Sequence, residues 1–211
     1  MEIRNKNILV LAPHTDDGEL GAGGTIHKLI QQGCTVDYVA FSAAEDSVPE
    51  GFDKDVLRTE VLNATSALGI LTKNVTVLSY KVRTFPSNRQ QILDDLIKIR
   101  KKKDYDIILT PSSMDIHQDH KTVTEEAIRA FKQKTMLGYE LIWNNLTSAS
   151  TCFIKLNVSN VKAKSLAMSE YKSQQGRDYT SAEFINSLAK TRGVQIGAEY
   201  AECFEVIRVV L

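Results

Sequence analysis

The stretch NILVLAPHTDDGELGAGGTI, residues 7–26, decides how this chain folds. It opens on a continuous apolar run, Asn7–Leu11, of the kind that forms a strand buried on both faces of a parallel sheet. A short polar segment follows, and apolar residues then recur at helical spacing until Gly33. The stretch therefore predicts a buried strand, a turn that carries polar side chains, and a helix over 21–33.

Strand and helix patterns continue to alternate along the chain. Further strands are predicted at 36–42, 75–79 and 106–110, and helices at 53–69, 90–101 and 122–132. This alternation is typical of βαβ units, in which right-handed crossovers join parallel strands. The less regular remainder predicts strands at 139–143, 151–156 and 205–211, and helices at 161–171 and 182–190. Because no internal repeat or linker is present, we predict one α/β domain over 1–211, Rossmann-like, with a mainly parallel sheet flanked by helices.

The composition excludes several classes of protein. Lysine and arginine (26) balance aspartate and glutamate (26), so no overall field attracts nucleic acid or an anionic membrane. No apolar run approaches the roughly 20 residues that cross a bilayer, and Met1–Asn7 is too polar for a signal peptide. The three cysteines are odd in number and widely spaced, which argues against a disulfide framework. We expect a cytoplasmic protein with a small-molecule partner, no nucleic acid and no membrane span.

Three of the four histidines fall in two short polar clusters. The first, PHTDDGE at 13–19, directly follows the opening strand, and the second, DIHQDH at 115–120, follows the strand at 106–110. In doubly wound sheets, ligands bind at the C-terminal ends of the strands, where the strand order reverses. In the common order 3-2-1-4, the first and fourth strands are neighbours. The two clusters are therefore predicted to face each other across that crevice.

The residue types in these clusters suit a divalent metal ion. Two imidazoles and one carboxylate with an open position describe a catalytic zinc site. His14 and Asp17 are three residues apart in a predicted turn and can reach one ion, and His120 supplies a third ligand from the other cluster. The alternative is that these polar residues only cap helices and turns. That alternative explains a single aspartate, but not three histidines and three aspartates at two adjoining strand ends.

The remaining members of the clusters suit catalytic roles. Asp16 cannot easily share the ion within the same turn, so we interpret it as the base beside the attacking water. His117 is placed to present a proton or a positive charge to the substrate. Asp119 is suited to hold the second ring nitrogen of a histidine.

The segment Gly21–Gly24 (GAGG) raises the alternative of a phosphate-binding loop. It lacks the G-x-G-x-x-G spacing, and no Lys-Ser or Lys-Thr pair follows it. We interpret these glycines as residues that let the ligand-bearing loop turn tightly and let the first helix pack close to the sheet.

The segments Ala12–Ile26 (APHTDDGELGAGGTI) and Asp115–His120 (DIHQDH) resemble the PIG-L/LmbE-like de-N-acetylase family. The opening motif of that family is Ala-His-Pro-Asp-Asp-Glu followed by Gly-x-Gly-Gly-Thr, and its second motif is His-x-Asp-His. This chain departs from the opening motif at two positions. Thr15 stands in place of the proline, and Gly18 in place of the glutamate, with Glu19 one place later.

The resemblance implies a zinc-dependent hydrolase that removes the N-acetyl group from an amino sugar of the GlcNAc type and releases acetate. In such an enzyme, water held by the metal attacks the amide. Carried over by position, the resemblance implies metal binding by His14, Asp17 and His120, base catalysis by Asp16, an electrostatic or acid role for His117, and a supporting role for Asp119.

Arg58 matches an arginine that lines the substrate pocket in this family, and we add Glu45 and Arg83 as candidate contacts to a sugar or to an anionic aglycone. The expected cofactor is Zn²⁺, with another divalent transition metal such as Fe²⁺ as the alternative. Family members often form symmetric oligomers, so the resemblance also allows a homo-oligomer. Two other functions stay open, namely an amidase for another acyl amide or a thiol conjugate, and a non-catalytic sugar- or nucleotide-binding domain. Asp16 favours an enzyme, because a binder needs no unligated carboxylate beside the ion.

Overall fold

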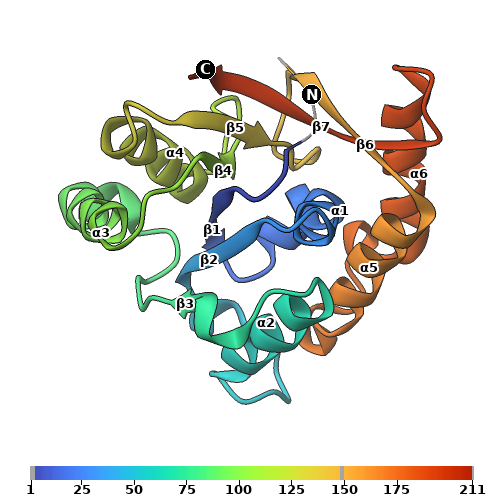
Figure 1. Ribbon diagram of the computed structural model, residues 1–211. Coiled ribbons are helices and arrows are strands. Elements are labelled where there is room, and N and C mark those ends of the chain that lie inside the picture. Colours follow the sequence, from blue (N-terminus) through green and yellow to red (C-terminus); the bar gives the residue numbers. More distant parts are fainter. Residues whose placement is uncertain (1–2, 148–149, 211) are drawn as a thin grey trace.

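Seven strands form one sheet through the centre of the protein (Figure 1). The computed structural model describes residues 3–147 and 150–210. Along the sheet, the strands are β3 (Val75–Val77), β2 (Thr35–Ser42), β1 (Asn7–His14), β4 (Ile107–Pro111), β5 (Thr135–Tyr139), β7 (Tyr200–Arg208) and β6 (Ser150–Leu156). All pairs from β3 to β5 are parallel, and β7 runs antiparallel to both of its neighbours. The predicted mainly parallel sheet is confirmed, with β1 beside β4.

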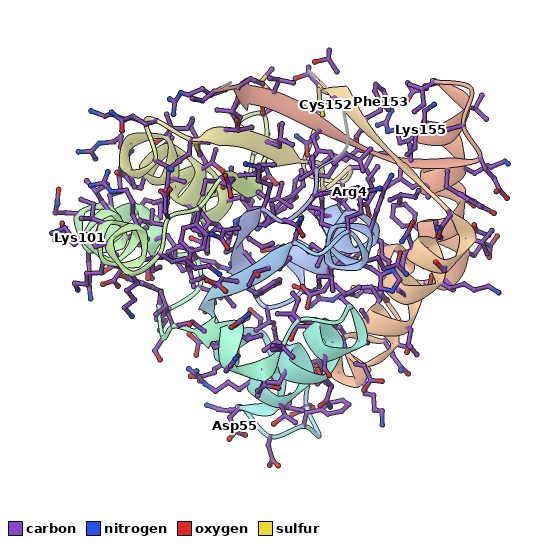
Figure 2. The ribbon with its side chains drawn as sticks, in the orientation of Figure 1. Arg4, Asp55, Lys101, Cys152, Phe153 and Lys155 are labelled. Atoms are coloured by element: carbon purple, nitrogen blue, oxygen red, sulfur yellow. The ribbon has the colours of Figure 1, made fainter. Side chains whose placement is uncertain are left out.

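The helices cover both faces of the sheet. One hydrophobic cluster packs against α1 (Asp17–Gln31), α2 (Val56–Ala67), α5 (Val158–Ser169) and α6 (Ala182–Val194), and the other against α3 (Arg89–Lys102) and α4 (Gln118–Ala130). Along β1, Ile8 and Val10 belong to the first cluster, whereas Leu9 and Leu11 belong to the second. Successive side chains of a strand point to opposite faces, so a strand between two helical layers must be apolar throughout. In Figure 2, side chains fill the space between sheet and helices, and the charged Lys101 lies on the outside.

Helices α1 and α4 each begin four residues earlier than the sequence predicts. The carbonyl of Asp16 accepts a hydrogen bond from the Leu20 amide at 3.0 Å, and the carbonyl of His117 accepts one from the Lys121 amide at 2.9 Å. The first helical turn therefore includes residues that the sequence pattern assigned to the loops. As a result, Asp17 and His120 project from helix N-terminal turns, which hold a side chain more firmly than a loop does.

The glycines of the opening motif lie inside α1, so the expectation that they form a tight turn is wrong. The other part of that interpretation, close packing against the sheet, is confirmed. A Cβ at Gly21 would lie 2.1 Å from Cδ2 of Tyr139, and a Cβ at Gly24 would lie 2.5 Å from Cδ1 of Leu156. At Gly21 the contact involves the buried Tyr139 side chain down to its Cβ, so this helix can approach the sheet closely only with glycine there, whereas at Gly24 the terminal methyl group of Leu156 would have to shift.

The prediction of a strand at 139–143 is wrong, since β5 ends at Tyr139. The chain instead enters a turn, in which the Leu141 carbonyl accepts hydrogen bonds from the amides of Asn144 and Asn145 at 2.8 and 3.1 Å. The predicted terminal strand is shifted, because β7 spans Tyr200–Arg208. Leu211 of that prediction and residues 1–2 of the polar opening lie outside the described residues. Within the described part of the chain, no helix has the length and apolar character to cross a membrane.

Candidate active site

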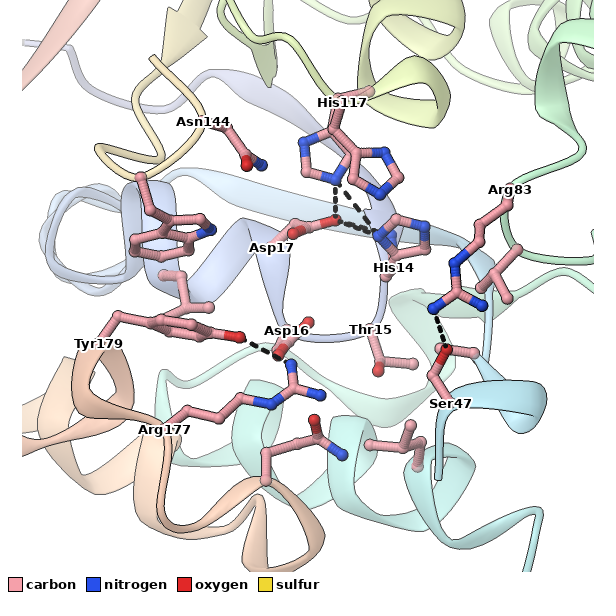
Figure 3. A pocket seen from close by; sticks show the side chains of 17 residues that line it. His14, Thr15, Asp16, Asp17, Ser47, Arg83, His117, Asn144, Arg177 and Tyr179 are labelled. Carbon is pink, nitrogen blue, oxygen red and sulfur yellow. Dashed lines mark hydrogen bonds and ion pairs between the residues drawn. The ribbon is translucent and has the colours of Figure 1, made fainter. Parts of the chain in front are cut away.

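The two polar motifs meet at the C-terminal ends of β1 and β4, where they line one cavity of about 220 Å³ (Figure 3). His14 is the last residue of β1, and Asp16 and Asp17 begin the turn into α1. His117 and His120 enter from the start of α4. The parallel pairing of β1 with β4 places these segments side by side, although the two motifs are about a hundred residues apart in sequence.

Three atoms from the two motifs form a compact triangle. Asp17 Oδ2 lies 3.1 Å from His14 Nδ1 and 3.2 Å from His120 Nε2, and the two nitrogens are 3.3 Å apart. In tetrahedral coordination with metal–ligand bonds of about 2.0–2.1 Å, neighbouring ligand atoms are about 3.3 Å apart. The chemistry and the spacing of this donor set therefore fit a single zinc-sized cation.

Two buried aspartates orient the histidine rings. Asp119 Oδ2 lies 3.1 Å from His14 Nε2, and Asp115 Oδ2 lies 2.8 Å from His120 Nδ1. A carboxylate on the second ring nitrogen fixes the tautomer of a metal-binding histidine and increases its basicity. Asp119 makes the histidine contact that the sequence suggested. Asp115 was not assigned a role from the sequence, and its place at the beginning of the DIHQDH motif was the only signal.

His117 offers a different nitrogen to the cavity. The ligand atoms of His14, His117 and His120 lie within 4.8 Å of one another, so the three histidines could also hold an ion. However, His117 is the N-cap residue of α4, and its Nδ1 accepts a hydrogen bond from the Asp119 amide at 3.2 Å. This bond uses the Nδ1 lone pair, so the neutral ring carries its proton on Nε2 and is a donor there. We therefore favour Asp17 over His117 as the third ligand.

Electrostatics separates the roles of the three imidazoles. Burial lowers the pKa of His14 and of His120, but the neighbouring carboxylates together outweigh it, Asp17 with Asp119 at His14 and Asp17 with Asp115 at His120, and raise the two pKa values to about 9 and about 10. Burial, followed by the nearby charges of His120 and His14, lowers the pKa of His117 below its ordinary value. The lowered pKa favours the neutral ring, which can present the Nε2 proton, one of the two roles that the sequence left open for His117.

Asp16 is the unligated carboxylate of the cavity. It occupies the N-cap position of α1, yet its side chain caps no backbone amide. Burial, and then the neighbouring Asp17, raise the pKa of Asp16 to about 6. It is therefore ionised at pH 7 but more basic than an ordinary aspartate, as a general base requires.

A buried hydrogen-bond network supports the loop that carries Asp16. The hydroxyls of Tyr38 and Tyr171 lie 2.9 and 2.6 Å from the carbonyl of Thr15. Both also contact the carboxyl of Glu19, with Tyr171 at 2.8 Å. Burial raises the pKa of Glu19 to about 8. The glutamate that stands one place later than in the family motif therefore lies beneath the loop and not in the cavity.

The three candidate substrate contacts are placed differently. Arg83 lines the cavity beside His14 and Asp16. Arg58 and Glu45 pair with each other at 3.0 Å and line a neighbouring hollow, which shares Val82 with the cavity.

Sequence reasoning missed Arg177, which enters the cavity from the loop that precedes α6, more than 150 residues after the first motif. No local pattern in that loop indicates a role. Its neighbour Tyr179 stacks on Trp143, with ring centres 4.1 Å apart and planes 17° apart, and both rings line the cavity. The stacking of these two rings became evident only from the fold.

The fold is a doubly wound sheet. Its cavity holds two histidines and an aspartate whose donor atoms could bind one ion, beside an aspartate with a raised pKa. This combination is typical of a metal-dependent hydrolase. The sequence comparison identifies its family. The model of the PIG-L family, GlcNAc-PI de-N-acetylase, matches residues 9–131, and the chain belongs to this family. It is accordingly a metal-dependent deacetylase. The expected family, fold and enzyme class are thus confirmed.

Individual relatives agree with this placement. The chain is 26% identical over 174 residues to the uncharacterized deacetylase YaiS of Escherichia coli (strain K12), a match that covers 81% of this chain and 92% of YaiS. Among solved structures, it resembles the conserved protein TT1542 from Thermus thermophilus, with a TM-score of 0.81, 23% identity, and coverage of 98% of this chain and 96% of the other. It also resembles the N,N'-diacetylchitobiose deacetylase from Pyrococcus horikoshii, with a TM-score of 0.77, 22% identity, and coverage of 98% and 87%. At these identities, the structural likeness shows the fold alone.

Proposed function

We propose that this protein hydrolyses the acetamide of an N-acetylated amino sugar of the GlcNAc type and releases acetate, with Zn²⁺ as its ion. The observation that carries the proposal is the triangle of His14 Nδ1, Asp17 Oδ2 and His120 Nε2 with Asp16 beside it. The family description and the name of the P. horikoshii relative support an N-acetyl sugar. We take residues 1–211 as one catalytic domain.

His14, Asp17 and His120 would hold the ion. Once bound, Zn²⁺ would act as a Lewis acid on the acetamide carbonyl and would lower the pKa of water from 15.7 towards about 7. His14 and His120 are held for this task by Asp119 and Asp115. An ion of similar size and ligand preference, such as Fe²⁺, fits the same three atoms.

Asp16 and His117 perform the proton transfer and the charge stabilisation. Asp16 takes the proton of the attacking water and then returns it to the leaving amine, which its pKa of about 6 favours. The Nε2–H of His117 donates a hydrogen bond to the oxygen of the former carbonyl as negative charge develops on that oxygen, and the proton stays on His117. A neutral imidazole is an adequate donor for this purpose, and a single positioned donor of this kind is typically worth about 10²–10³ in rate.

The test is a panel of amides assayed for acetate and free amine after the protein is loaded with Zn²⁺. We expect turnover of N-acetylglucosamine and its glycosides, and none of an acyl amide or a thiol conjugate that lacks the sugar. Turnover confined to the non-sugar amides would instead establish the broader amidase. Zinc binding without turnover of any amide would point to the non-catalytic sugar- or nucleotide-binding alternative.

A further inference from the structure

Arg83 and Arg177 both reach the cavity, and the charge of Arg177 also acts on the nearby Asp16 carboxylate, where it opposes the rise of the Asp16 pKa. Four other arginines bind carboxylates, namely Arg58, Arg89, Arg129 and Arg192. In the described part of the chain, Arg83 and Arg177 form no ion pair, and each contacts a hydroxyl. Arg83 Nη2 lies 3.5 Å from Ser47 Oγ, and Arg177 Nη1 donates to Tyr179 Oη at 2.7 Å.

The backbone holds Arg83 in place at an energetic cost. Its φ is +65°, a left-handed conformation that is strained for a residue other than glycine. Two hydrogen bonds from the first turn of α4 maintain it. The amide of Arg83 donates to Asp119 Oδ2 at 2.6 Å, and its carbonyl accepts from Gln118 Nε2 at 2.6 Å. The segment that leads Arg83 into the cavity is therefore fixed to the same helix as His120.

Arg177 is held at the opposite side of the cavity by aromatic rings. Its guanidinium lies 5.9 Å from the centre of the Tyr179 ring, and Tyr179 is itself stacked on Trp143. In Figure 3, the guanidiniums of Arg83 and Arg177 come from opposite sides with Thr15 between them, and Asp16 lies beside the Arg177 guanidinium. A guanidinium carries five N–H donors, so most donors of both arginines remain available to a ligand.

The charge of the loaded cavity favours an anion. Among the side chains that line the cavity, the carboxylates of Asp16 and Asp17 balance a divalent cation, and the two guanidiniums add positive charge at the surface that a ligand contacts. The carboxylates of Asp115 and Asp119 lie behind the histidine rings and are not part of that lining. The planar fork of arginine matches carboxylate and phosphate oxygens. The departing acetyl group ends in a methyl group, so an anionic group has to belong to the amine half of the substrate.

We infer that Arg83 and Arg177 form a subsite for an anionic oxygen group, a carboxylate or a phosphate, on the amino-sugar half of the substrate. This inference rests on the proposed function and defines its substrate class as acidic N-acetyl amino sugars. Arg83 and Arg177 are thus specificity-determining residues, whereas Asp16 and His117 act at the scissile amide.

The experiment compares three substrates that differ only at the anomeric oxygen: the methyl glycoside, the carboxymethyl glycoside and the 1-phosphate of N-acetylglucosamine. The proteins are the zinc-loaded wild type, Arg83→Gln, Arg177→Gln, the double variant, and Lys172→Gln as a control that removes a surface charge outside the cavity. We expect the wild type to prefer the anionic substrates in kcat/KM. In the double variant, the ratio of kcat/KM for the anionic substrates to kcat/KM for the methyl glycoside should fall by about 10-fold to 100-fold, because the lost hydrogen bonds to a charged group affect only the anionic substrates.

Each outcome decides one of the two proposals. An equal loss on neutral and anionic substrates, or a wild type that prefers the methyl glycoside, overturns the anion subsite and leaves the deacetylase in place. Acetate release from none of the substrates overturns the proposed function. In that case, calorimetry with glucosamine 1-phosphate tests the arginines separately. Binding that weakens in the double variant but not in Lys172→Gln supports the subsite, and equal binding in all variants overturns it.

Discussion

The ring of Tyr38 occupies the space that a side chain at Gly18 would need: a Cβ there would lie 2.6 Å from Cε2 and 2.8 Å from the hydroxyl oxygen of Tyr38. The family motif has a glutamate at this position, and this chain has glycine followed by Glu19. The vacated space admits the Tyr38 hydroxyl, which reaches the Thr15 carbonyl at 2.9 Å. Gly18 and Tyr38 therefore act together to support the loop before Asp16.

This contact predicts the effect of enlarging position 18. Gly18→Ala forces a methyl group against a fully buried ring, so we expect a loss of about 1–3 kcal/mol in the free energy of unfolding, measured by urea titration. Gly23→Ala in the same helix is the control, because its Cβ would meet only Lys164 side-chain carbons, at 3.0–3.4 Å. Equal stability of the wild type and Gly18→Ala would contradict the packing argument.

The third metal ligand is distinguished by two substitutions. We expect Asp17→Asn to lose zinc, as His120→Ala does, whereas His117→Ala retains it, because Nδ1 of His117 already accepts the Asp119 amide. Zinc per chain after dialysis is the measurement. His27→Ala, a histidine outside the cavity, is the control. If His117→Ala released zinc as completely as His120→Ala, the three histidines would be the ligands.

Asp115 provides a test of the ring orientation. Asp115→Asn keeps an oxygen that can accept the His117 amide but removes the negative charge beside His120 Nδ1. We expect the affinity for zinc to fall by about 10-fold to 100-fold, the usual effect of losing such a partner. Competition with a chelator measures this affinity. An unchanged dissociation constant would show that the carboxylate is not needed to orient the ring.

Asp16→Asn separates catalysis from metal binding. The Asp16 side chain is outside the ligand triangle, so zinc content should stay at the wild-type level. Because general-base catalysis typically contributes about 10²–10⁴ in rate, kcat should fall by at least about 100-fold. Steady-state assays on the best substrate of the panel measure this loss. Turnover near the wild-type rate would refute Asp16 as the base.

Zinc binding should release protons at neutral pH. Against the opposing effect of burial, the neighbouring carboxylates raise the pKa of His14 and of His120 to about 9 and about 10, so without the ion these rings hold protons that binding must displace. We expect about one to two protons released per ion at pH 7, and an affinity that weakens as the pH falls. Calorimetry in buffers of different ionisation enthalpy measures this number. A binding enthalpy independent of the buffer would contradict the prediction.

Much of the fold and of the metal site could be predicted because both depend on local patterns. The apolar run Asn7–Leu11 is buried on both faces, as the sequence indicates, and the parallel sheet follows from the alternation of strands and helices. The clusters around His14 and His120 were predicted to meet because each follows a parallel strand. Their ring nitrogens do lie 3.3 Å apart across 106 positions of sequence.

The errors arise where tertiary contacts override local preference. A segment with Gly21, Gly23 and Gly24 has poor helix propensity, yet it is helical in the structure. The missing side chains allow α1 to pack closely against Tyr139 and Leu156, and this packing offsets the low propensity. Arg177 carries no local signal, since its place at the cavity depends on the stacking of Tyr179 on a ring from another loop. The roles of the individual site residues stay predictions that the variants above can test.

Asp119 connects the candidate metal site to the segment that carries Arg83. Its carboxylate contacts the ring of His14, the amide of Arg83 at 2.6 Å and the amide of Phe85 at 3.3 Å, and its side chain has no exposed surface. The same carboxylate therefore holds the ring of a candidate metal ligand and the backbone at 83–85. A substitution of Asp119 is expected to disturb the metal site and the cavity wall at Arg83 together.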